Sequence, residues 1–162
     1  MTKKTWMRFL IIPLLFVVAI ASPASATVSE ADAKYAQAAG KATQDFTTAI
    51  GSWGDTYQTA PQNVNSTDYK NWVKLAAAAD NQVRVALKNF SQMKVSSGYK
   101  KSDVILRKFV KDYSAAINLY APAIKKNDQK LVKKANDALL AATSVFSKWG
   151  TAFAQDTAAL AK

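Results

Sequence analysis

The sequence lacks most of the side chains that carry out catalysis. It contains no histidine and no cysteine in 162 residues, and Glu30 is its only glutamate. These absences exclude the usual proton shuttle at neutral pH, thiol chemistry, and metal sites with nitrogen or sulfur ligands. The sequence also has no glycine-rich phosphate loop and no nucleophile elbow. We therefore expect no enzymatic activity, no metal and no cofactor. A hydrolase using only aspartate and lysine is the one enzyme alternative.

Cationic side chains are the abundant chemical groups, with 22 lysines and arginines against 11 acidic residues. Residues 67–134 carry most of this excess, and ten of their basic residues fall into two sets. The first set opens the third predicted helix and comprises Lys100, Lys101, Arg107, Lys108 and Lys111. The second set surrounds the following turn and comprises Lys125, Lys126, Lys130, Lys133 and Lys134.

These two basic sets predict attraction to a polyanion. The candidate partners are an anionic envelope polymer such as wall teichoic acid, an anionic membrane surface, or an acidic protein face. Nucleic acid is disfavoured, because only Arg84 and Arg107 are arginines in residues 27–162 and no planar stacking platform is evident. A solvated lysine surface without a partner is the alternative interpretation.

A second candidate site is aromatic. In an antiparallel bundle, the end of the first helix, the start of the second, the end of the third and the start of the fourth meet. That arrangement gathers Trp53, Tyr57, Tyr69, Trp72 and Tyr120 at one end. Aromatic rings with polar tips can line a pocket for a small apolar or aromatic ligand. We favour the alternative, in which these rings plug the end of the bundle.

Helices must position both sites, because the apolar residues recur at alternating spacings of three and four. The clearest case is residues 69–93, whose apolar face is Tyr69, Trp72, Ala76, Ala79, Val83, Ala86, Phe90 and Met93. The same periodicity predicts four helices, at about residues 29–60, 67–94, 102–126 and 128–161. Joined by short connections, they predict one all-α domain, residues 27–162, folded as an up-down-up-down four-helix bundle.

Local signals predict how these helices begin and pack. We expect the four helices to be capped by Ser29, by one of Ser66, Thr67 and Asp68, by Ser102-Asp103 and by Asn127-Asp128. Pro122 should kink or restart the third helix. Alanines dominate the middle of each apolar face, so we expect the aromatic residues to cluster toward the ends.

Residues 1–26 have the pattern of a cleavable signal peptide. Lys3, Lys4 and Arg8 precede the apolar run 9–21, and Ala24-Ser25-Ala26 is a small-x-small cleavage site. We expect cleavage after Ala26, so that the protein is secreted or associated with the cell envelope. An uncleaved membrane anchor is the competing interpretation. Without Lys3, Lys4 and Arg8, 19 basic and 11 acidic residues remain, a net charge of +8.

The functional hypothesis is a non-enzymatic secreted protein that binds a partner at the cell envelope or outside the cell through its basic surface. One alternative is a carrier of a small apolar or aromatic ligand at the aromatic end. The other is a membrane-active cationic toxin, because cationic amphipathic helices can insert their apolar faces into a bilayer.

Overall fold

Four long helices make up the computed structural model, which describes residues 28–126 and 128–162. The helices are α1 (Glu30–Gln58), α2 (Thr67–Gln92), α3 (Lys100–Lys125) and α4 (Gln129–Leu160), and a short 3-10 turn, η1 (Ser97–Tyr99), precedes α3. There is no strand in the described ranges, which confirms the prediction of an all-α chain with four helices. The predicted signal peptide, residues 1–26, lies outside the described residues.

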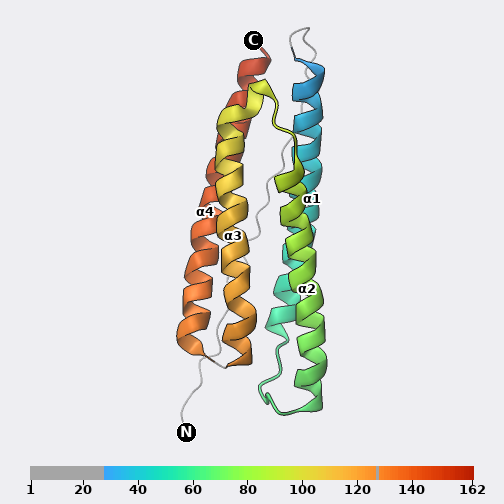
Figure 1. The fold of residues 1–162 in the computed structure, drawn as a ribbon, viewed down its shortest axis with the longest axis vertical. Helices are drawn as coiled ribbons and strands as arrows, with labels where there is room; N and C mark the ends of the chain where they lie inside the picture. Colours follow the sequence, from blue (N-terminus) through green and yellow to red (C-terminus); the bar gives the residue numbers. More distant parts are fainter. Residues whose placement is uncertain (1–27, 127) are drawn as a thin grey trace.

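The helices alternate in direction along the long axis of the molecule (Figure 1). The connections α1–α2 and α3–α4 lie at one end of the molecule, and the α2–α3 connection lies at the other, beside the start of α1 and the end of α4. The chain therefore forms two helical hairpins, α1–α2 and α3–α4. Within the described helices, no Cα atom of α1 lies within 8 Å of one of α4.

Three of the four helices begin with the cap that the sequence predicts. The hydroxyl of Ser29 accepts the amide of Asp32 at 3.1 Å, and the hydroxyl of Ser66 accepts the amide of Tyr69 at 3.0 Å. The carboxylate of Asp128 accepts the amides of Lys130 and Leu131, both at 3.0 Å. Each cap satisfies amides that have no partner within the first turn of a helix.

The cap predicted for α3 is wrong. The helix begins at Lys100, two residues before the predicted start, and has no side-chain cap from its own N-cap residue, Tyr99. Instead, the amide of Ser102 donates to Asp156 of α4 at 3.1 Å, and the hydroxyl of Ser102 donates to the carbonyl of Tyr99 at 3.1 Å. A carboxylate from another helix thus replaces the local cap.

Pro122 does not restart α3, which continues as one helix to Lys125. Proline lacks the amide that would bond to the preceding turn, but this position lies in the last turn of the helix, where little helix follows. Backbone hydrogen bonds form the turn that follows the helix. The amide of Lys126 donates to the carbonyl of Pro122 at 3.1 Å, and the amide of Asp128 donates to the carbonyl of Ala123 at 2.9 Å.

Aromatic rings also fill the middle of the core, so the expectation that they cluster toward the ends is wrong. Phe46, halfway along α1, lies 5.2 Å from Phe109, 5.0 Å from Tyr113 and 5.6 Å from Phe146 between ring centroids. The wide spacing of α1 and α4 explains this arrangement, because alanine side chains cannot span such a distance and large rings can. The core therefore joins the two hairpins through aromatic contacts.

Candidate functional site

The first basic set forms an exposed group at the start of α3, here named the α3-start cluster. Its members are Lys100, Lys101, Lys108 and Lys111, all exposed to solvent. Lys108 forms an ion pair with Asp112 one turn further along the same helix. Exposed pairs of this spacing hold the side chain only weakly. The cluster thus presents four cations to solvent.

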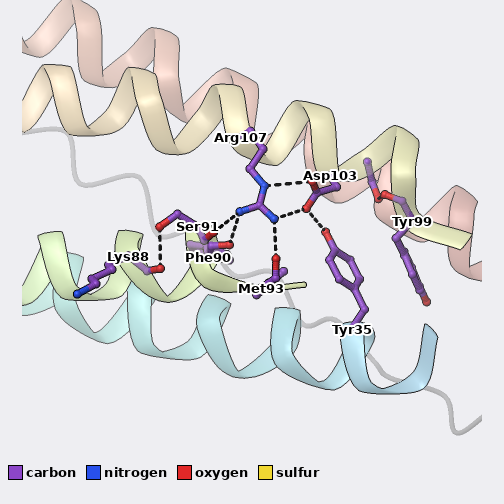
Figure 2. A network of polar contacts seen from close by, with 9 residues as sticks. Tyr35, Lys88, Phe90, Ser91, Met93, Tyr99, Asp103 and Arg107 are labelled. Carbon is purple, nitrogen blue, oxygen red and sulfur yellow. Dashed lines mark hydrogen bonds and ion pairs between the residues drawn. The ribbon is translucent and has the colours of Figure 1, made fainter. Parts of the chain in front are cut away.

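Arg107 was predicted to belong to this surface, but the structure uses it differently (Figure 2). Its guanidinium donates to both carboxylate oxygens of Asp103, at 3.1 and 2.9 Å. It also donates to three carbonyls at the end of α2, those of Phe90, Ser91 and Met93, at 3.1, 2.6 and 2.8 Å. The end of a helix carries partial negative charge and unsatisfied carbonyls. Arg107 therefore ties α3 to α2.

The second basic set surrounds the α3–α4 connection and is here named the turn cluster. Its members are Lys126, Lys130, Lys133 and Lys134, all exposed. Lys133 forms an ion pair with Asp137 on the surface of α4. Lys125 is the last residue of α3, and its side chain lies outside the part of the chain that the structure describes. Sequence reasoning passed over Lys148, an exposed lysine in the middle of α4, because it stands alone in the sequence.

Three of these lysines lie in the first turn of a helix. Lys100 and Lys101 open α3, and Lys130 is the second residue of α4. The start of a helix carries partial positive charge, so a cation there is unfavourable by about 0.3–1 kcal/mol. Lysine at these positions weakens each helix and adds its charge to that of the helix end, which concentrates positive potential at two places.

The structure brings the five residues of the predicted aromatic site together. Ring centroids are 4.5 Å apart for Trp53 and Tyr57, 4.8 Å for Trp53 and Tyr120, and 5.5 Å for both Tyr57–Trp72 and Tyr69–Trp72. None of the five side chains is more than 8% exposed. These rings pack against one another as aromatic residues do in a filled core.

Buried polar partners satisfy the tips of these rings. Asp80, which sequence reasoning missed, is 6% exposed and accepts the indole N–H of Trp53 at 2.8 Å and the hydroxyl of Tyr57 at 3.0 Å. Burial, followed by the nearby carboxylate of Asp80, raises the pKa of Tyr57. The indole N–H of Trp72 donates to the carbonyl of Thr56 at 2.8 Å, and the hydroxyl of Tyr69 donates to the carbonyl of Ile124 at 3.4 Å. The hydroxyl of Tyr120 donates to the side chain of Asn136.

The one signal for Asp80 in the sequence was its position. It directly follows Ala79, which lies on the apolar face of α2, so an aspartate there is close to the core. A buried carboxylate needs donors, and the nearest candidates in the bundle were the indole and phenol groups at this end. Asp80 therefore joins α1 to α2 within one hairpin.

A further polar network holds the α2–α3 connection at the opposite end. The hydroxyl of Tyr35 donates to Asp103 at 2.9 Å, and the amide of Gly98 donates to Asp32 at 3.0 Å. The hydroxyl of Ser29 is the main group that lowers the pKa of Asp32, and the amide of Gly98 also lowers it. Burial, followed by the bond to Asp103, raises the pKa of Tyr35. These contacts fix the connection to α1.

Two further observations concern the described residues. No three acidic side chains gather there in a group that could hold a metal ion. None of the four helices in the described ranges combines the length and apolar character needed to cross a membrane.

No protein-family model, curated protein or solved structure matches this chain.

Proposed function

We propose that this chain is an exported, non-enzymatic protein that binds an anionic partner at the cell envelope or outside the cell. The α3-start cluster and the turn cluster make the contact. Arg107 is excluded from it, because its guanidinium is occupied by Asp103 and the end of α2. The remaining cations are lysines, which supply charge without the fixed geometry that arginine gives.

The observation that carries this proposal is the placement of Lys100, Lys101 and Lys130 in the first turns of α3 and α4. Helix stability alone favours acidic residues at these positions. Acidic groups already serve these helix starts, Asp156 at α3 and Asp128 at α4. The lysines beside them break a local preference, which is typical of a functional site. A solvated surface with no partner would gain nothing from lysines at both helix starts.

Export is supported by the pattern of residues 1–26, in which a basic start and an apolar run precede Ala24-Ser25-Ala26. The proposed mature protein begins at Thr27. Expression in a bacterial host and mass measurement of the protein recovered outside the cytoplasm tests this. A mass starting at Thr27 supports export with cleavage, and a full-length protein held in the membrane fraction contradicts it.

Retention on isolated anionic envelope material tests the binding function. The protein should remain bound at low salt and elute as salt increases, because counterions screen exposed lysines. An uncharged polymer matrix serves as the control for non-specific adsorption. Retention that is the same at low and high salt would contradict the proposal.

The aromatic end gives less support to the carrier alternative. Its rings are in mutual contact and their polar tips already have protein partners. A ligand would have to separate these rings and break those bonds. Tryptophan fluorescence of Trp53 and Trp72 against a panel of apolar and aromatic compounds tests the alternative, with a saturable change as its signature.

A further inference from the structure

The two lysine clusters lie at opposite ends of α3. Their nearest members on α3, Lys111 and Lys126, are 15 positions apart, which corresponds to about 22 Å at 1.5 Å per residue of helix. Between them, residues 112–124 contain one charged side chain, Asp112, and it is paired with Lys108. A compact anion can therefore contact only one cluster at a time.

The two clusters nevertheless lie at the two ends of the same helix pair, because α3 and α4 run next to each other along one seam (Figure 1). On α3, Lys101 and Lys108 are seven residues apart and share one row. This row is on the flank opposite Asp103, which contacts α1 through Tyr35, so it faces the α4 side. The row continues toward the turn cluster through the exposed residue Ala115.

The matching row on α4 carries Lys134 and Lys148, separated by two intervals of seven. It lies near the flank of Asp156, whose carboxylate contacts Ser102 of α3. Lys148 thus lies beside the same seam, at about the level of Lys108, because the neighbouring rings of Phe109 and Phe146 pack 4.6 Å apart between centroids. Between the two lysines, exposed Ala141 adds no negative charge to the row.

The seam offers charge but no surface for base stacking. Every aromatic residue in the described ranges is buried, and the large exposed apolar side chains there are valines and leucines. Proteins that bind single-stranded nucleic acid combine cations with exposed rings on which bases stack. Lysines along a seam without rings fit a chain of phosphate groups rather than a series of bases.

We propose that the partner is a linear phosphate polymer that lies along the α3–α4 seam and bridges the α3-start cluster and the turn cluster. This inference rests on the proposed function and specifies the chemistry and minimum length of its partner. Once one cluster has bound, the second cluster meets the same chain at a high effective concentration. Binding should therefore strengthen stepwise at the chain length that spans both clusters.

The experiment is a binding titration with inorganic polyphosphate fractions of narrow length distribution, shorter and longer than the distance between the clusters. We expect long chains to bind on the order of 100-fold more tightly than short ones. Replacing either Lys100 and Lys101 or Lys130 and Lys134 with glutamine should reduce the affinity for long chains to about that of short chains. The control replaces Lys34 and Lys41 of α1 with glutamine and removes the same number of charges. It should keep the difference in affinity between long and short chains.

The outcomes separate this inference from the function on which it rests. Affinity that rises smoothly with length, or short chains that bind as tightly as long ones, overturns bridging and leaves polyanion binding intact. Tighter binding of single-stranded DNA than of polyphosphate of equal extended length overturns the choice of a bare phosphate chain. No binding at any length in low salt overturns both proposals.

Discussion

Arg107 and Lys108 are neighbours in the sequence with opposite roles. Arg107 makes five hydrogen bonds to Asp103 and to the end of α2, whereas Lys108 makes one exposed pair with Asp112. Arg107→Gln should lower the free energy of unfolding by about 1–3 kcal/mol, because it removes the charged donor of five hydrogen bonds to Asp103 and to the end of α2. Urea denaturation measures the change.

Lys108→Gln is the matched control, since it removes the same charge from the next position. Its expected cost is at most about 0.5 kcal/mol, the strength of an exposed pair one turn apart. Equal losses for the two variants would show that Arg107 does not tie α2 to α3.

Asp32 should make the stability depend on pH. Its pKa is lowered in the folded protein by the hydroxyl of Ser29 and the amide of Gly98. The unfolded state therefore takes up the proton first, and the contribution of Asp32 is present above about pH 4 and lost as pH falls below it. Unfolding free energies measured at neutral pH and at about pH 3 should differ less for Asp32→Asn than for the wild type. An identical pH dependence would contradict this.

The residue types and their spacing predicted the apolar helix faces that are buried, such as Tyr69, Trp72 and Phe90 on α2. They did not predict the role of Arg107, which depends on the end of α2 lying beside α3. The partners of Asp80 were equally hidden, because Trp53 and Asp80 are 27 positions apart. Periodicity tells which face of a helix is buried but not which atoms meet there.

At the scale of the helices, replacing either of two glycines with alanine should change the stability in opposite directions. A Cβ built on Gly51 has no atom within 4 Å, so Gly51→Ala should stabilise α1 by about 0.5–1 kcal/mol. A Cβ on Gly98 would lie 2.7 Å from both Asp32 and Leu160. Both neighbours are tips of flexible side chains that can move, so Gly98→Ala should destabilise the protein mainly by displacing the Asp32 hydrogen bond, by about 0.5–1.5 kcal/mol. Thermal denaturation that shows the same sign for both would contradict this.

Local signals located most helix ends but missed the start of α3. Ser29, Ser66 and Asp128 act as predicted because a cap needs only the next few residues. The cap of α3 comes from Asp156, 54 positions away from Ser102. A long-range cap leaves no signature near the helix that it serves.

At the scale of the molecule, the proposed function implies a conflict between stability and binding. Lys130→Gln removes a cation from the positive end of α4 and should raise the unfolding free energy by about 0.3–1 kcal/mol. The same variant should bind envelope material more weakly. Paired denaturation and retention measurements test both effects, and a loss of stability would indicate that Lys130 has a structural role.

The all-α class and the four helices followed from the sequence because one periodicity extends through every segment. The aromatic contacts around Phe46 could not be predicted in this way, because they depend on how far α1 lies from α4. The two lysine sets could be identified in the sequence, because their members lie close together along the chain. Their separation along one seam required the helices to be placed.

Comparison of two variants with equal net charge tests the central claim most directly. One replaces Lys100, Lys101, Lys130 and Lys134 with glutamine, and the other replaces Lys34, Lys41, Lys70 and Lys74. Affinity for anionic envelope material is measured for both at one low salt concentration. The account predicts that the first variant loses most of its binding and the second stays close to the wild type. Equal losses in the two variants would mean that net charge, and not the two clusters, causes the attraction.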